Sequence, residues 1–591
     1  MVPLFLLLEH LKGLAAVWGI VLLAGFPVCA ALRLRLGLPG YVLMGIVYWT
    51  ISLYVFCFDG GLNVALGLAL TTSLATMAVR MREQYRWRSL RPRHPWATGT
   101  LALGCAVYAS VILWNYIPLG VDAGMVGASA RMISSHRGLP ASYAPWFGDL
   151  FFPTVNLGLP TIGSIAISWG CEPGSVVLGL AQLGYSAWIL AAYLVLRLWV
   201  RPSPAAVLAV AQAWGARLAQ NTIGWGGFPT VAGMAIGLLA VRLLWRASRR
   251  GTVRPALALG MTAGAIPLVH GVSAAVWLYS VAPVASLALL VKSHQRGRTL
   301  VTLISAAGVS GLVLGCYLLS GQVHMSQAEI DWSQGHIRAD APLADTWTGA
   351  MASSLNYLKR FSGGHIAWMG AASWMALLAL GRWRSALAIA ICLLLLVFIL
   401  ANANWWILPF SMMIYPNRVV HWGGALAAIA MALAWKATRQ RFPNLGNFGI
   451  GLGVGFTLLV FMFTQHINQY QRNVWHAPIG KDGWEALGWA ETHMNAPGTF
   501  VQATYGSVGS FLPGCAGVPT SAWQIHHCAM DEWQTVLQRL QPTHQLCVRG
   551  VDSGPLPKGK ILFQNSTVTI LEIKPVENWS GADYNEPDFR K

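Results

Sequence analysis

Long apolar runs separated by short polar stretches constrain this chain more than any other feature of its sequence. A helix needs about 20 consecutive apolar residues to cross the hydrocarbon core of a bilayer. Charged residues make up only 10% of the chain, against roughly 25% in soluble domains. The sequence therefore predicts a mainly α-helical polytopic membrane protein with about 14 transmembrane helices. The predicted helices span residues 12–32, 40–57, 60–79, 97–117, 175–198, 203–220, 227–245, 255–269, 271–291, 299–319, 365–381, 385–402, 419–435 and 447–466.

The positive charges follow a regular pattern along the predicted helices. The net charge of +19 would suit a nucleic-acid partner, but the Arg and Lys residues lie in short loops between apolar runs. Basic loops of this kind face the cytoplasm in polytopic membrane proteins. Each odd-numbered predicted helix is followed by a basic loop, which places those loops in the cytoplasm and both termini outside. We therefore expect no nucleic-acid partner.

The loops predicted to face outward are much longer than the inner ones. Within the first of them, residues 153–169 predict a helix that lies on or dips into the outer leaflet. The chain accordingly divides into three predicted parts. These are N-terminal membrane helices (1–96), a transmembrane core (97–466) with outer loops 118–174 and 320–364, and an exterior domain (467–591).

The exterior domain differs from the rest in its pattern. Asp482 and Glu485 resemble a capping box that would open a helix ending near Met494. Short runs rich in β-branched residues follow, which predicts a small α/β domain. The predicted strands are 499–505, 545–549, 560–563 and 567–573.

Nine cysteines are present, and most of them fall inside apolar segments, where a thiol behaves as a small buried hydrophobe. In an exported domain, Cys515 and Cys528 are the pair that we expect to form a disulfide, although spacing does not fix connectivity. The chain contains no CxxC or HExxH motif, so a structural zinc site is not expected.

Two acids in the first outer loop are the candidates for chemistry. Asp122 lies in a polar loop directly after a predicted membrane helix, and Asp149 lies later in the same loop. A solvated loop acid or a helix cap is the plain interpretation of Asp122. Alternatively, the two carboxylates act as general base and partner, or hold a divalent cation such as Mg or Mn through oxygen ligands.

Several cations on the predicted outer side could bind a lipid phosphate. Arg418 stands at the outer end of a predicted helix, against the positive-inside trend, and a guanidinium offers paired donors to phosphate oxygens. Lys359 and Arg360 lie on the same predicted side. His270 interrupts an apolar run, and polar groups at membrane depth often face cavities. Interfacial or structural roles remain open for each of these residues.

At this point the layout resembles the GT-C superfamily of integral-membrane glycosyltransferases. The order of several short stretches carries the resemblance, over most of the chain after about residue 97. A departure is Gly271, which stands where the family's His-Pro element has proline. The stretches are Gly120-Val121-Asp122-Ala123-Gly124-Met125, Ala130-Arg131-Met132-Ile133, Gly138-Leu139-Pro140, Phe151-Phe152-Pro153, Gly224-Trp225-Gly226-Gly227-Phe228-Pro229, His270-Gly271-Val272-Ser273-Ala274-Ala275, Tyr415-Pro416-Asn417-Arg418 and Trp484–Pro519.

The resemblance implies a specific activity. The protein would move one sugar from a polyprenyl-phosphate donor to an acceptor hydroxyl, with inversion, at the outer face of a bacterial inner (plasma) membrane. Asp122 would be the catalytic base, and Arg418 would lie near the lipid phosphate. The acceptor would be a glycan, a glycolipid or an exported protein.

Two other classes of function remain open from the sequence. A multi-helix transporter or lipid flippase would explain the helix count but not the long outer loops or the exterior domain. Transporters also tend to show internal repeats, and no repeat is evident in this chain. A non-catalytic exterior scaffold, or a ligase that moves whole glycans, is the third alternative.

Overall fold

The computed structural model describes most of the membrane helices and the centre of the C-terminal domain. All structural statements below refer to these residues. They are 2–83, 94–113, 115–116, 120–140, 146, 156–215, 226–250, 253–292, 296–319, 346–361, 364–402, 419, 421–442, 480–494, 496–503, 507–522, 537–538, 540–549 and 559–573.

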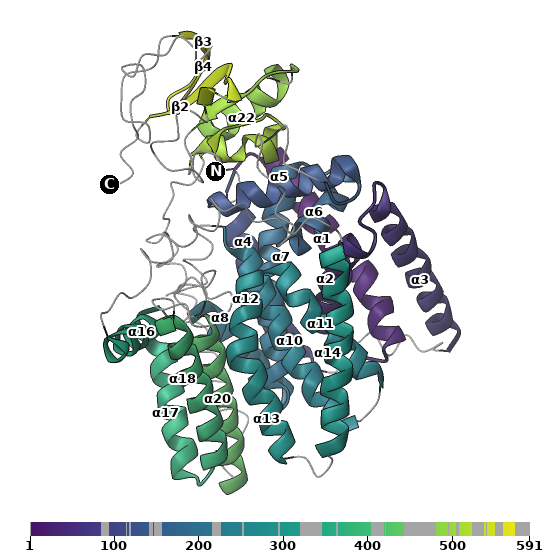
Figure 1. Cartoon of the computed structure of the whole chain (residues 1–591), viewed down its shortest axis with the longest axis vertical. Helices are drawn as coiled ribbons and strands as arrows, with labels where there is room; N and C mark the ends of the chain where they lie inside the picture. The colour runs from purple at the N-terminus through teal and green to yellow at the C-terminus, as the bar shows by residue number, and fades with distance from the viewer. Residues whose placement is uncertain are drawn as a thin grey trace.

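A bundle of long helices forms the body of the protein (Figure 1). Thirteen of the predicted membrane segments coincide with helices, and the last, 447–466, lies outside the described residues. Eight described helices are long and apolar enough to cross a membrane, as an integral membrane protein requires. The helices that match the predictions are α1 (Leu4–Ala31), α2 (Gly37–Val55), α3 (Gly61–Glu83), α4 (Pro95–Leu113), α7 (Pro173–Leu196), α8 (Pro202–Gly215), α10 (Phe228–Arg250), α11 (Val253–Val269), α12 (Gly271–Val276) continued by η2 (Trp277–Val281) and α13 (Ala282–Lys292), α14 (Arg296–Leu319), α17 (Gly364–Ala379), α18 (Trp383–Asn402) and α20 (His421–Arg441).

Helix α7 lies at the centre of the bundle, and its membrane-spanning window is completely buried. Pro173 occupies the first turn, where its missing N–H costs nothing. The Glu172 carboxylate caps the helix by accepting hydrogen bonds from the backbone N–H groups of Gly174 and Ser175. Helices α1 and α10 pack along α7.

The first predicted outer loop contains two helices, of which only the second was predicted. Helix α5 (Val121–His136) lies across the top of the bundle, beneath the C-terminal domain (Figure 1). Asp122 is therefore in the first turn of a helix, whereas the sequence predicted a loop at this position. Helix α6 (Gly158–Ser168) is buried along most of its length against α2, α5 and α7. The predicted helix within residues 153–169 is present, and its neighbours in the fold enclose it. Its place on or in the outer leaflet stays a prediction.

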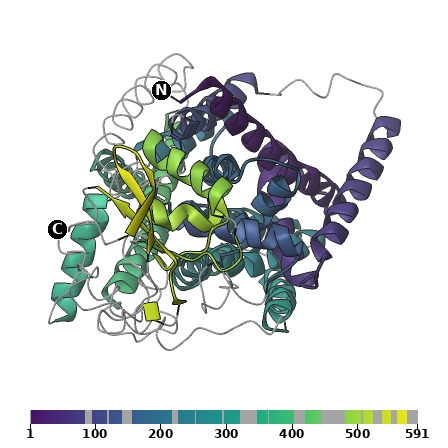
Figure 2. The same cartoon turned by 90° about the horizontal axis from the view of Figure 1, so that it is seen from above.

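The C-terminal domain contains α22 (Lys481–His493) and a four-stranded sheet, and it covers the top of the bundle (Figure 2). The strand order is β1-β2-β4-β3, with β1 and β2 parallel and the other pairs antiparallel. The predicted α/β character is confirmed in the described part. The strands are β1 (Val501–Ala503), β2 (His544–Val548), β3 (Gly559–Gln564) and β4 (Val568–Ile573).

Two local predictions for this domain are wrong. Gly480 is the N-cap of α22, and no side chain caps it, so Asp482 does not open a capping box. The Asp482 carboxylate instead accepts a hydrogen bond of 3.0 Å from the Thr567 hydroxyl in the turn between β3 and β4. Cys515 is a free thiol, so it does not form the expected disulfide with Cys528, which lies outside the described residues.

Candidate active site

Asp122 lies where three parts of the protein meet. It is half-buried in the first turn of α5, which begins after Gly120 with that glycine at φ 87°. A carboxylate in the first turn of a helix is favoured by the positive end of the helix dipole. The position suits an acid that has to stay ionised.

The glycine-rich start of α10 packs directly against this turn. Gly226 has φ +84°, and a Cβ atom there would lie 2.6 Å from the backbone nitrogen of Ala123 and 3.2 Å from the oxygen of Gly120. Only glycine combines this backbone conformation with this approach. Two stretches that resemble the GT-C superfamily, far apart in sequence, are thereby brought into contact at Asp122.

The C-terminal domain contacts the next turns of α5. A Cβ atom on Gly124 would lie 2.5 Å from the carbonyl oxygen of Ser510. One on Gly514 would lie 2.8 Å from the backbone nitrogen of Ala128. The segments η5 (Val508–Phe511) and η6 (Leu512–Ala516) therefore rest on the backbone of α5. The helix that carries Asp122 is held between the bundle and the C-terminal domain.

The Arg131 side chain connects α5 to neighbouring parts of the protein. Its Nη1 donates to the Cys515 carbonyl at 3.0 Å, and its Nη2 lies 3.6 Å from Oε1 of Glu491 on α22. The guanidinium also lies over the Trp146 ring, 5.9 Å from its centroid. The Trp146 carbonyl accepts a hydrogen bond from the Thr520 N–H at 2.9 Å. One side chain thus joins α5, the first outer loop and the C-terminal domain.

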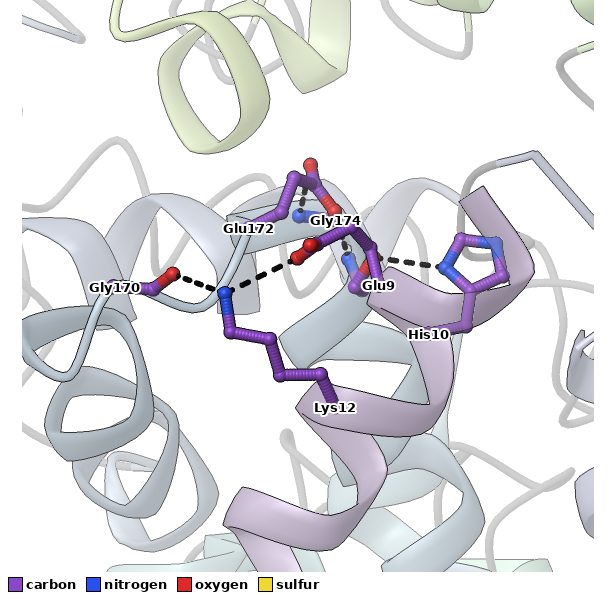
Figure 3. Close-up of polar contacts among 7 residues, drawn as sticks. Glu9, His10, Lys12, Gly170, Glu172 and Gly174 are labelled. Carbon is purple, nitrogen blue, oxygen red and sulfur yellow. Dashed lines mark hydrogen bonds and ion pairs between the residues drawn. The ribbon is translucent and has the colours of Figure 1, made fainter. Parts of the chain in front are cut away.

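Polar contacts also fix the outer ends of α1 and α7 (Figure 3). The Lys12 ammonium donates to the Gly170 carbonyl at 2.8 Å and pairs with Glu9 at 3.4 Å. The buried His10 ring contacts the Ser175 hydroxyl through Nδ1 at 2.8 Å, and its Nε2 donates to the Asn115 carbonyl at 3.1 Å. These bonds hold the two helices beneath α5.

His270 has a structural position rather than an exposed one. Its side chain is buried and caps α12, because Nδ1 accepts a hydrogen bond of 3.1 Å from the Ser273 N–H. The other ring nitrogen, Nε2, lies 2.9 Å from the Thr230 hydroxyl on α10. These two contacts give the His270 ring a role in joining α10 to the start of α12. The phosphate-binding role that the sequence predicted for His270 stays a prediction.

The structure describes the side chains of only some of the predicted site residues. Asp149 and Arg418 lie outside the described residues. Lys359 and Arg360 are on α16 (Trp347–Phe361), and their side chains are not described. Among the described residues, no cluster of three His, Cys, Asp or Glu side chains could hold a metal ion. The roles of these four residues and the divalent cation therefore stay predictions.

The fold is similar to solved membrane-protein structures. The apo oligosaccharyltransferase of Archaeoglobus fulgidus is 14% identical over 78% of this chain and 70% of that one, with a TM-score of 0.47. ArnT from Cupriavidus metallidurans, bound to undecaprenyl phosphate, is 12% identical over 81% of this chain and 98% of that one, with a TM-score of 0.49.

No family model matches the sequence. The curated proteins likewise contain no match. Identities of 12–14% concern the fold alone, so the assignment of an activity depends on the residues of this chain.

The sequence reasoning missed the role of Arg131. It lies within one of the recognised stretches, but its partner Cys515 is 384 positions away, and no local pattern predicts that contact. The one sequence signal was that Arg131 is a cation in a predicted outer loop with few charged residues.

Proposed function

We propose that this protein is a membrane glycosyltransferase that moves a single sugar from a polyprenyl-phosphate donor to an acceptor hydroxyl. Asp122 is the general base of the reaction, and the reaction takes place at the face of the bundle covered by the C-terminal domain. The observation that supports this most is the placement of Asp122. It is a half-buried acid at the junction of α5, the start of α10 and the C-terminal domain.

The proposed chemistry is a single displacement. The acceptor hydroxyl gives its proton to the Asp122 carboxylate as its oxygen bonds to the anomeric carbon. The bond between that carbon and the phosphate oxygen breaks, and its electron pair leaves with the polyprenyl phosphate. Attack on one face inverts the anomeric centre. General-base catalysis of this kind typically contributes roughly 10²–10⁴-fold.

The leaving phosphate needs positive charge in its vicinity, since charge develops there in the transition state. Arg418 is the proposed clamp, and Lys359 and Arg360 on α16 are further candidates. Asp149 is proposed either as a partner of Asp122 or as a second ligand of a divalent cation.

The replacement Asp122→Asn tests the base. It keeps the shape of the side chain and removes its basicity, so we expect transfer to fall by roughly 10²-fold or more with folding unchanged. The assay is release of polyprenyl phosphate from a lipid-linked monosaccharide by the purified full-length protein. Asp59→Asn is the matched control, because Asp59 is an exposed acid in another loop. Full activity of the Asp122 variant would exclude the proposed role.

The phosphate clamp and the cation have separate tests. Arg418→Ala should raise the KM for the lipid donor and leave the KM for the acceptor unchanged. An unchanged donor dependence would count against the clamp. Loss of transfer on chelation, restored by Mg or Mn, would support a cation held by Asp122 and Asp149. Activity that is indifferent to chelation favours Asp122 acting without one.

A further inference from the structure

A cluster of arginines lies at the end of the bundle opposite Asp122. Arg197 follows the last residue of α7, while Arg242 and Arg246 lie one turn apart near the end of α10. Helix α10 begins beside Asp122 and runs away from it along α7 (Figure 1). These three residues are called the basic cluster below.

Arg242 has an unusual environment within this cluster. Its side chain is half-buried, and the charges that act on it most are those of Arg197 and Arg246, both of the same sign. The Nε atom of Arg242 is buried and has no hydrogen-bond partner in the structure. A buried donor without a partner destabilises the fold, and more so when it is charged. An anion beside Arg242 would offset the repulsion and supply the missing hydrogen-bond partner.

Helices α1, α2, α7 and α10 have no acid near the cluster. No Asp or Glu occurs between Glu9 and Asp59, the stretch that holds most of α1 and all of α2. None occurs between Glu172 and Glu329, the stretch that holds α7 and α10. The basic cluster is therefore formed by segments that contain only positive charges. A counter-ion has to come from elsewhere.

Helix dipoles explain two of the three arginines. Cations are favoured at helix C-termini, where carbonyl groups lack partners. Arg197 donates to the Val200 carbonyl at 2.7 Å, just beyond the end of α7. Arg246 donates to the Arg33 carbonyl at 2.9 Å, just beyond the end of α1. Arg242 makes no such bond, so the dipoles do not explain its position.

Two tryptophans mark the depth of the cluster in the membrane. The rings of Trp199 and Trp245 meet edge to face, with centroids 6.4 Å apart. Trp245 lies between Arg242 and Arg246 along α10, and Trp199 lies two residues after Arg197. Tryptophan collects at the level of the lipid headgroups. The two tryptophans beside the arginines are what we expect at the level of the lipid phosphates.

We propose that the basic cluster binds the phosphate group of an anionic glycerophospholipid in the leaflet at this end of the bundle. Guanidinium groups bind phosphate oxygens with paired, charge-assisted hydrogen bonds. Basic pockets between membrane helices are suited to such headgroups. The bound phosphate would offset the repulsion among the three arginines and clamp α7 to α10. The proposal does not depend on the activity proposed for Asp122.

The test is thermal unfolding of the purified full-length protein in a neutral detergent, with added lipid. We expect phosphatidylglycerol to raise the Tm and phosphatidylcholine to leave it unchanged. Arg242→Gln should remove at least half of the phosphatidylglycerol shift. Arg254→Gln is the matched control, since Arg254 is exposed near the start of α11 at the same end of the bundle, and it should keep the full shift. Arg242→Lys, which retains the charge, should keep most of it.

The same experiment separates lipid binding from a purely structural role. Without lipid, Arg242→Gln should unfold at the same or a higher temperature than the wild type, because the repulsion is relieved. A lower Tm without lipid, or a full phosphatidylglycerol shift in this variant, would overturn the proposal. If Arg242→Gln does not fold, Arg197→Gln takes its place; here only the phosphatidylglycerol shift is compared, because this variant also loses the bond to the Val200 carbonyl. An equal shift from inorganic phosphate alone would show a site for soluble anions and would overturn the assignment to a lipid.

Discussion

Arg131 on α5 and Glu491 on α22 pair across the boundary between the membrane bundle and the C-terminal domain, with 3.6 Å between Nη2 and Oε1. The same guanidinium donates to the Cys515 carbonyl. Asp122 lies on the helix that this contact secures. The docking of the C-terminal domain and the placement of the proposed base are therefore linked through one side chain.

Replacement of Arg131 should loosen that docking. Arg131→Gln removes a charge-assisted hydrogen bond and leaves Glu491 next to Glu172 without its cation, for which we expect a loss of about 1–3 kcal/mol. Limited proteolysis should release the C-terminal domain earlier, and transfer should fall with it. Arg137→Gln, at the exposed end of the same helix, is the control. Identical proteolysis of both variants would contradict the clamp.

The contribution of Glu491 to stability should change with pH in the opposite direction from that of an ordinary paired carboxylate. Burial raises the pKa of Glu491, and the nearby Glu172 adds to this, while Arg131 opposes it. The folded protein therefore favours the protonated form, and the carboxylate costs stability at neutral pH. Glu491→Gln should unfold at the same or a higher temperature at pH 7. Its advantage should shrink as the pH falls toward 4 and the wild-type carboxyl protonates. A clearly lower Tm at pH 7 would show that the ion pair dominates.

Gly226 should tolerate no side chain. In Gly226→Ala, a methyl group would meet the backbone of Ala123 and Gly120 in addition to the strain of a positive φ. Gly170→Ala carries the same kind of strain, at φ +80°, with no atom within 4 Å of the new Cβ. Strain alone costs roughly 1–2 kcal/mol. The Tm should therefore fall further for Gly226→Ala, with a larger loss of transfer, and equal effects in the two variants would rule out the close contact.

His270 should act through structure and not through charge. His270→Ala removes the cap of α12 and the bond to Thr230, and losing a cap costs roughly 0.5–2 kcal/mol. Thr230→Val removes the bond to the ring alone and should give a smaller loss. Neither change should alter the KM for the lipid donor, in contrast to Arg418→Ala. A raised donor KM in His270→Ala with an unchanged Tm would restore the predicted phosphate contact.

The candidate site could be anticipated only in part. Asp122 stood out because acids are scarce in this chain, and its neighbours in the fold explain why it matters. The hydrogen bonds of His270 join it to Ser273 and Thr230, and the Thr230 bond joins separate helices. From composition alone, a polar residue in an apolar run is expected to face a cavity. In the structure, His270 instead makes two hydrogen bonds within the core.

The sequence by itself determined the membrane helices and the four strands, because apolar length and alternation are local properties of the chain. Only the tertiary structure decided that α5 is a helix pressed between two parts of the protein, and that α6 is buried. It also decided that Arg131 meets Cys515 and Glu491. Contacts of this kind join residues hundreds of positions apart, and no periodicity encodes them. The neighbours against which these residues are buried determine their hydrogen bonds and charge interactions.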